Sequence, residues 1–78
     1  MQLEFKPVVL DVTSGDSAGM LISHRGALLA IAAKLSALHD EHAGWWFVEI
    51  IFNSDIKAPR DPFPDIQALD LWLNSQVS

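Results

Sequence analysis

Gly44-Trp45-Trp46-Phe47-Val48-Glu49-Ile50-Ile51-Phe52 is the stretch that decides the fold. It holds two of the three tryptophans and two of the four phenylalanines of the chain. Because β-branched and aromatic residues fit a pleated surface, the stretch predicts a β-strand. Strict alternation gives one face Trp46, Val48, Ile50 and Phe52, and the other Trp45, Phe47, Glu49 and Ile51. Both faces are apolar, which predicts a strand in the middle of a sheet, or in a sheet whose outer face meets another chain.

Two further strands are predicted upstream of this stretch. The first covers residues 3–12, and Pro7 places it at a sheet edge or at a bulge, because proline donates no ladder hydrogen bond. A turn over residues 13–17 leads into a second strand over residues 18–24. Residues 23–26 predict a hairpin turn, with Gly26 at the position that needs a positive φ.

Residues 27–38 fit two interpretations. Leu28, Ile31, Leu35 and Leu38 recur at helical spacing, and the alanines favour a helix. Leu29, Ile31, Ala33 and Leu35 also alternate, as in a strand. A glycine turn directly after a strand favours a hairpin, and a sheet of three strands would leave the aromatic strand poorly covered. We therefore predict a strand over residues 27–36, with the helix as the alternative.

The C-terminal part predicts a linker followed by a helix. Pro59, Pro62 and Pro64 forbid a ladder over residues 53–64, where Phe63 is expected to anchor the chain to the core. Asp65 can cap a helix over residues 65–77. Its apolar stripe comprises Ile66, Leu69, Trp72, Leu73 and Val77, with Gln67, Asp70 and Asn74 opposite. Leu71 falls off the stripe and should be exposed, or buried by a partner.

Together these elements predict one α+β domain over residues 1–78. Its architecture is a small, mostly antiparallel sheet of about four strands in a meander, with the C-terminal helix packed on one face. A chain of 78 residues buries a limited core, and it contains no cysteine with which to form a disulfide. Half of its residues are hydrophobic, more than one small core readily hides.

The charge distribution argues against several classes of partner. The formal net charge is −5, and the five cationic residues are scattered along the chain. Nucleic-acid binding depends on clustered cations, so neither nucleic acid nor an anionic membrane is an expected partner. The start of the chain lacks the pattern of a signal peptide, and its longest uncharged apolar run, residues 27–33, is too short to span a bilayer. We expect a cytoplasmic protein.

One cluster carries ligand chemistry. His39, Asp40, Glu41 and His42 place two imidazoles and two carboxylates within four residues. Such groups suit Zn, Ni or Mn, so His39 and His42 are candidate metal ligands, and the loop could bind a metal or a small ligand. The simpler interpretation is a solvated hairpin loop. No nucleophile–base pair, paired carboxylates or cofactor fingerprint stands out, so we expect no catalytic residues, no cofactor and no enzyme activity.

The order of these motifs resembles a family of short bacterial proteins with a domain of unknown function. The resemblance rests on residues 19–21, the turn at 25–28, the run from His42 to Glu49, and Phe63-Pro64-Asp65 before Ala68 and Trp72. It covers most of the chain and implies a glycine-containing hairpin, an aromatic strand and a terminal helix. It implies no activity.

A single helix can cover one sheet face only. The opposite face would expose an apolar patch, and such patches mark interaction sites. We therefore expect a non-enzymatic protein-interaction module that forms a homodimer through this face. Trp45, Trp46, Phe47 and Leu71 are the candidate interface residues, and one of the two adjacent tryptophans should serve folding while the other serves association.

Overall fold

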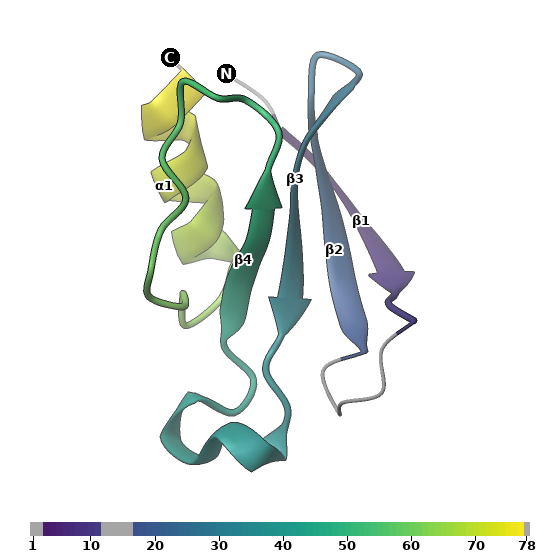
Figure 1. The fold of residues 1–78 in the computed structure, drawn as a ribbon, viewed down its shortest axis with the longest axis vertical. Coiled ribbons are helices and arrows are strands. Elements are labelled where there is room, and N and C mark those ends of the chain that lie inside the picture. The colour runs from purple at the N-terminus through teal and green to yellow at the C-terminus, as the bar shows by residue number, and fades with distance from the viewer. Residues whose placement is uncertain (1–2, 12–16, 78) are drawn as a thin grey trace.

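The chain folds as an α+β structure, which confirms the predicted class (Figure 1). The computed structural model describes residues 3–11 and 17–77, apart from the side chains of residues 38 and 39. Within these residues lie four strands, one short 3₁₀ segment and one α-helix. In chain order they are β1 (Leu3–Val9), β2 (Ala18–His24), β3 (Ala27–Lys34), η1 (Ala37–His42), β4 (Trp46–Ile51) and α1 (Ile66–Val77).

The four strands form an antiparallel meander in the order β1-β2-β3-β4. Residues 27–34 are therefore a strand, and the helical alternative is wrong. The local cause is the two-residue turn between β2 and β3, where Arg25 has φ 54° and Gly26 has φ 80°. Two successive positive φ values match the twist of a tight hairpin, so the chain reverses and pairs instead of coiling.

β4 lies at one edge of the sheet, which corrects the expectation of a central position (Figure 1). Its alternation is also broken. Val48 pairs with Ala32 and Ile50 pairs with Ile31, so Glu49 is an extra, bulged residue. Beyond Glu49 the faces are exchanged relative to the predicted pattern. Ile51 joins Trp46 and Val48 on the side of α1, and the expected grouping of Ile50 with them is wrong.

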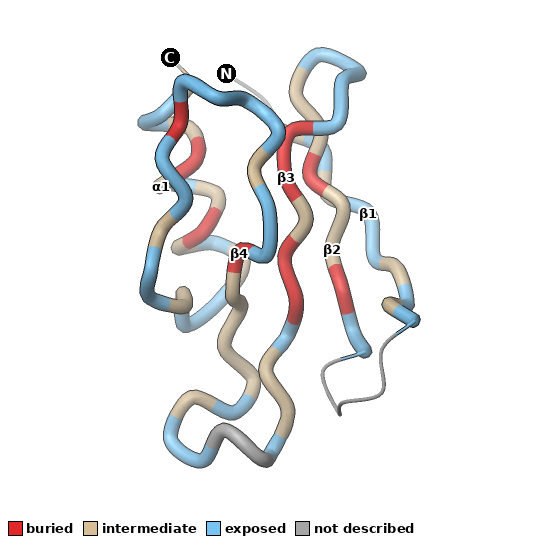
Figure 2. The backbone as a smooth tube through the Cα atoms, viewed as in Figure 1, coloured by how far each residue is buried: buried red, intermediate tan, exposed pale blue. Residues whose placement is uncertain are grey.

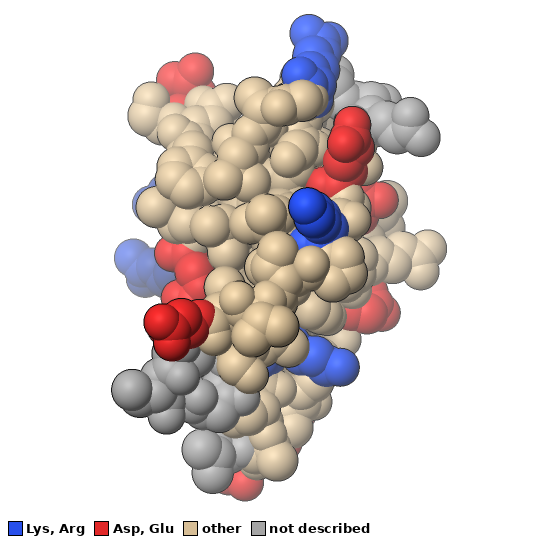
Figure 3. Space-filling model, turned by 90° about the vertical axis from the view of Figure 1, so that its right-hand side faces the viewer, with Lys and Arg blue, Asp and Glu red and all other residues tan. Residues whose placement is uncertain are grey.

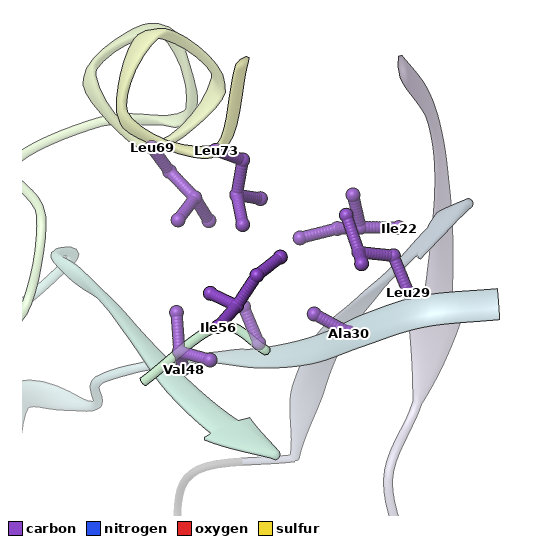
Figure 4. Packing of buried hydrophobic residues seen from close by; sticks show 8 residues of the cluster. Ile22, Leu29, Ala30, Val48, Ile56, Leu69 and Leu73 are labelled. Atoms are coloured by element: carbon purple, nitrogen blue, oxygen red, sulfur yellow. The ribbon is translucent and has the colours of Figure 1, made fainter. Parts of the chain in front are cut away.

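α1 packs on one face of the sheet and closes the core. Asp65 precedes the helix, and its Oδ1 accepts a hydrogen bond of 2.8 Å from the Ala68 amide, which confirms the predicted cap. Leu69 and Leu73 are fully buried against the sheet (Figures 2 and 4). Burying each contributes about 1.5–3 kcal/mol. The sheet and the linker supply the rest of the core: Ile22, Leu29, Ala30, Ala32, Val48 and Ile56.

Several local expectations need correction. The first strand ends at Val9, and most of the predicted turn that follows it, residues 13–16, lies outside the described residues. Asp70 and Asn74 are half-buried rather than on a fully solvated helix face, because they flank the stripe. Asn74 donates from Nδ2 to the carboxylate of Asp70, at 2.7 Å. Leu71 is exposed, as expected.

Candidate interaction face

The face of the sheet away from α1 is built from two cross-strand rows at its centre. One, the small row, is Val8, Gly19, Ala33 and Phe47, which are neighbours across the four strands. The other, the large row, is Lys6, Leu21, Ile31 and Ile50. Side chains in one row point to the same side of a pleated sheet, and alternate rows along the strands share that side. We call this surface the open face.

The open face continues beyond both rows at the β3–β4 side. Leu28 and Phe52 follow the large row, and Phe52 is held there by a 2.9 Å hydrogen bond from its amide to the carbonyl of Leu29. Leu35 and Trp45 follow the small row, where the amide of Leu35 donates to the carbonyl of Trp45 at 2.8 Å. The face is therefore four residues deep along β3 and β4.

Large apolar side chains remain accessible on this face. Leu28, Ile50 and Phe52 are 42%, 44% and 51% exposed, and Trp45 and Phe47 are half-buried. These side chains are absent from the set that packs against the helix-side core. Among the described residues, no helix or loop lies over this part of the sheet (Figure 1). Scattered apolar surface residues are ordinary, but a contiguous sheet face is not.

Charge on the open face is sparse. Glu4 and Lys6 lie on β1, the strand farthest from the aromatic residues of β4, and the exposed bulge residue Glu49 lies on β4 itself. Seen from the side remote from α1, the surface is mostly uncharged, with isolated groups of both signs (Figure 3). A strongly charged partner would find no complementary field here.

Two small residues lie at the β2–β3 boundary of the open face. Gly19 and Ala33 are neighbours in the small row and are buried. Leu10 folds over Gly19, because a Cβ added to Gly19 would lie 2.8 Å from Leu10 Cγ. Leu21 and Ile31, in the next row, are larger side chains. Leu10 therefore occupies the space over Gly19 on the open face.

Both edges of the sheet are blunted. On the outer side of β4, the amide and carbonyl of Trp46 each form a 2.7 Å hydrogen bond with Phe63 of the linker. The other edge, β1, contains Pro7, whose ring nitrogen donates no hydrogen bond. Glu4 and Lys6 of the same strand are charged and exposed, and such side chains also discourage pairing with a further strand.

The structure separates the predicted interface residues. Trp45 and Phe47 lie on the open face, at the β4 side. Trp46 packs against the core on the side of α1 and therefore contributes to the stability of the fold. Leu71 is 68% exposed on α1, which covers the opposite side of the sheet, so it is not part of the same surface (Figure 1). The sequence did not single out Ile31, Ile50 or Phe52 as interface residues. Ile50 and Phe52 were missed because the bulge at Glu49 turns them toward the open face, whereas strict alternation groups them with Trp46 and Val48.

The cluster at residues 39–42 lies in η1 rather than in an open hairpin loop. His42 contacts Trp45 edge to face, with ring centroids 4.8 Å apart and an angle of 78°. Asp40 has a positive φ of 51° and interrupts the helical turn. Among the described side chains, no group of three potential ligands gathers. The side chain of His39 is outside those described, so metal binding by His39 and His42 stays a prediction.

No family model, curated protein or solved structure matches the chain. The described helix is too short to cross a membrane.

Proposed function

We propose that the protein is a non-enzymatic interaction module that forms a homodimer through the open face. One observation carries this proposal: a contiguous apolar sheet face, rich in aromatic residues, has no helix or loop over its β3–β4 side among the described residues.

The proposed partner is a second copy of the chain, because the charge and the residue types of the open face allow it to pack against another open face. Apart from Glu49 on β4, its apolar part carries no charged side chain among the described residues, so two copies bring few like charges together there. Its aromatic side chains, Trp45 and Phe47, are residue types that anchor interfaces. Because both sheet edges are blunted, two copies are expected to meet through the open face rather than through edge-to-edge strand pairing. Cytoplasmic localisation is part of the same proposal.

Sedimentation equilibrium at micromolar concentrations tests the homodimer. We expect a reversible monomer–dimer equilibrium, and a monomer at every concentration contradicts the proposal. Trp45→Ala should weaken association at least about tenfold, because truncating an interface anchor costs more than about 1 kcal/mol, while leaving the unfolding midpoint of the monomer nearly unchanged.

Trp46→Ala and Leu71→Ala are the matched controls. Trp46 packs against the core, so its loss should lower the free energy of unfolding by about 2–4 kcal/mol. Leu71→Ala removes an exposed apolar side chain on α1, remote from the open face, and should change neither quantity measurably. Equal effects of Trp45→Ala and Trp46→Ala on folding would contradict the two-sided placement.

A further inference from the structure

We infer that Glu49 limits the strength of the homodimer. Its carboxylate lies on the part of the open face that a second copy would cover, so neutralising this one charge should tighten association. The inference rests on the proposed homodimer and names the residue that sets its dissociation constant.

The bulge in β4 places the Glu49 side chain on the open side of the sheet. Val48 is buried on the side of α1, and alternation from Val48 directs the next side chain to the opposite side. The bulge then turns Ile50 to that same side, where it neighbours Ile31 across the strands. Glu49 is exposed there in the single copy. A carboxylate therefore lies directly beside an apolar row.

The neighbours of Glu49 on β4 are side chains on which the proposed interface depends. Phe47 lies two residues before Glu49 on the same side, and Phe52 lies two residues after Ile50. With a rise of about 3.3 Å per residue, both phenylalanines start within about 10 Å of Glu49 along the strand. Leu28, Ile50 and Phe52 are 42%, 44% and 51% exposed. A second copy that covers these side chains also covers the Glu49 carboxylate.

The cations of the sheet lie away from Glu49. Lys6 is on β1, and the edge strands β1 and β4 are three strand spacings, or about 14 Å, apart. Lys34 of the neighbouring strand β3 pairs with Trp46, in the row that faces α1. Covering Glu49 therefore moves a carboxylate from water into an apolar contact with no sheet cation of its own copy beside it. Such a transfer costs free energy and opposes association.

Sedimentation equilibrium of Glu49→Gln beside the unsubstituted chain tests the role of Glu49. Gln keeps the size and shape of the side chain and removes its charge, once in each copy of the dimer. We expect the dissociation constant to fall by about tenfold, the effect of relieving incompletely compensated charges. Because Glu49 is exposed in the single copy, the unfolding midpoint of the monomer should stay nearly unchanged.

Glu4→Gln is the matched control. It makes the same chemical change at an exposed glutamate of the open face and removes the same net charge. Glu4 lies on β1, however, away from the apolar side chains of β4. Its substitution should change the dissociation constant by less than about threefold, because charges that stay in water contribute little. Equal tightening by the two variants would trace the effect to the overall negative charge of the chain and would overturn the role of Glu49.

The double variant Glu49→Gln, Trp45→Ala separates the open face from the sheet edge. Glu49 also lies on an edge strand, where a charge discourages strand pairing. Because Trp45 lies on the open face, the double variant should dissociate at least about tenfold more readily than Glu49→Gln alone. A double variant that stays tightly associated, or assemblies larger than a dimer, would assign the tightening to the edge and overturn the inference.

The remaining outcomes separate the role of Glu49 from the homodimer itself. An unchanged dissociation constant for Glu49→Gln overturns the role of Glu49 and leaves the homodimer standing. A weaker dimer does the same, because Glu49 would then pair with a cation of the second copy. A dimer that forms only after the substitution supports the role of Glu49 and overturns association of the unsubstituted chain. If both chains are monomeric at every concentration, the homodimer and the role of Glu49 are both overturned.

Discussion

Gly19 is a position of the sheet that has no room for a side chain. Leu10 packs where a β-carbon would be, with Cγ, Cδ2 and Cδ1 at 2.8, 2.9 and 3.1 Å. The short contact includes the branch point of Leu10, which lies close to its backbone and cannot swing away freely. A glycine in a strand normally weakens it, so its presence here reflects this close approach.

Gly19→Ala should therefore lower the free energy of unfolding by about 1–3 kcal/mol, the usual cost of overpacking. Leu10→Ala removes the obstructing atoms, so the double variant should be less destabilised than the sum of the two single variants. Urea unfolding of the four proteins measures this coupling. Additive effects would contradict steric conflict between these two residues.

Arg25 occupies a backbone conformation that suits other residues better. Its φ is 54°, in the left-handed region, and it is exposed at the tip of the β2–β3 hairpin. Asn adopts this conformation more readily. Arg25→Asn should raise the free energy of unfolding by up to about 1 kcal/mol, measured by thermal or urea unfolding. Arg25→Val places a β-branched side chain at a positive φ and should lower the free energy of unfolding.

At the scale of elements, the bulge at Glu49 determines which side chains of β4 face α1. Because Glu49 is the extra residue, deleting it restores regular alternation and keeps every other β4 side chain on its present face. We expect this deletion to change the free energy of unfolding by less than about 1 kcal/mol, the scale of an ordinary surface change.

Deleting Lys6 is the matched control, because Lys6 is also an exposed charged strand residue but pairs with Leu21 without a bulge. Its removal would turn Leu3 and Phe5 away from the core and should cost about 3 kcal/mol or more. Comparable losses for the two deletions, measured by urea unfolding, would contradict the assigned bulge.

The same bulge marks the limit of what the sequence predicts. The type and order of the elements were predictable, because the hairpin turn at Gly26, the aromatic strand and the capped helix each have a local signal. The faces beyond Glu49 were not, since a bulge depends on pairing with β3 and leaves no mark in the β4 pattern. The edge position of β4 was missed because a strand that is apolar on both faces resembles a central strand. In β4 one of these faces packs toward α1, and the other belongs to the open face.

At the scale of the whole molecule, the blunted sheet edges should limit the proposed assembly to pairs. Pro7 lies on the edge strand β1, where an added strand would need amide donors. Pro7→Val restores a donor and raises strand propensity, so we expect larger assemblies to appear on prolonged incubation, detected by light scattering. Val8→Ile, a neighbouring change that leaves the proline in place, is the control. An unchanged scattering record for Pro7→Val would show that this edge is protected by other means.

Trp45 and Trp46 are adjacent in the chain, yet one indole lies on the open face beside His42 and the other packs against the helix-side core. The chain thus carries two optical probes, one on the face proposed for dimerisation and one in the core. Dilution should shift the emission of the first toward longer wavelength while the second keeps its signal, and denaturant should move both. A Trp72→Phe background, in which the remaining indole on α1 is silenced, would let a fluorimeter time subunit exchange and unfolding separately without any attached dye.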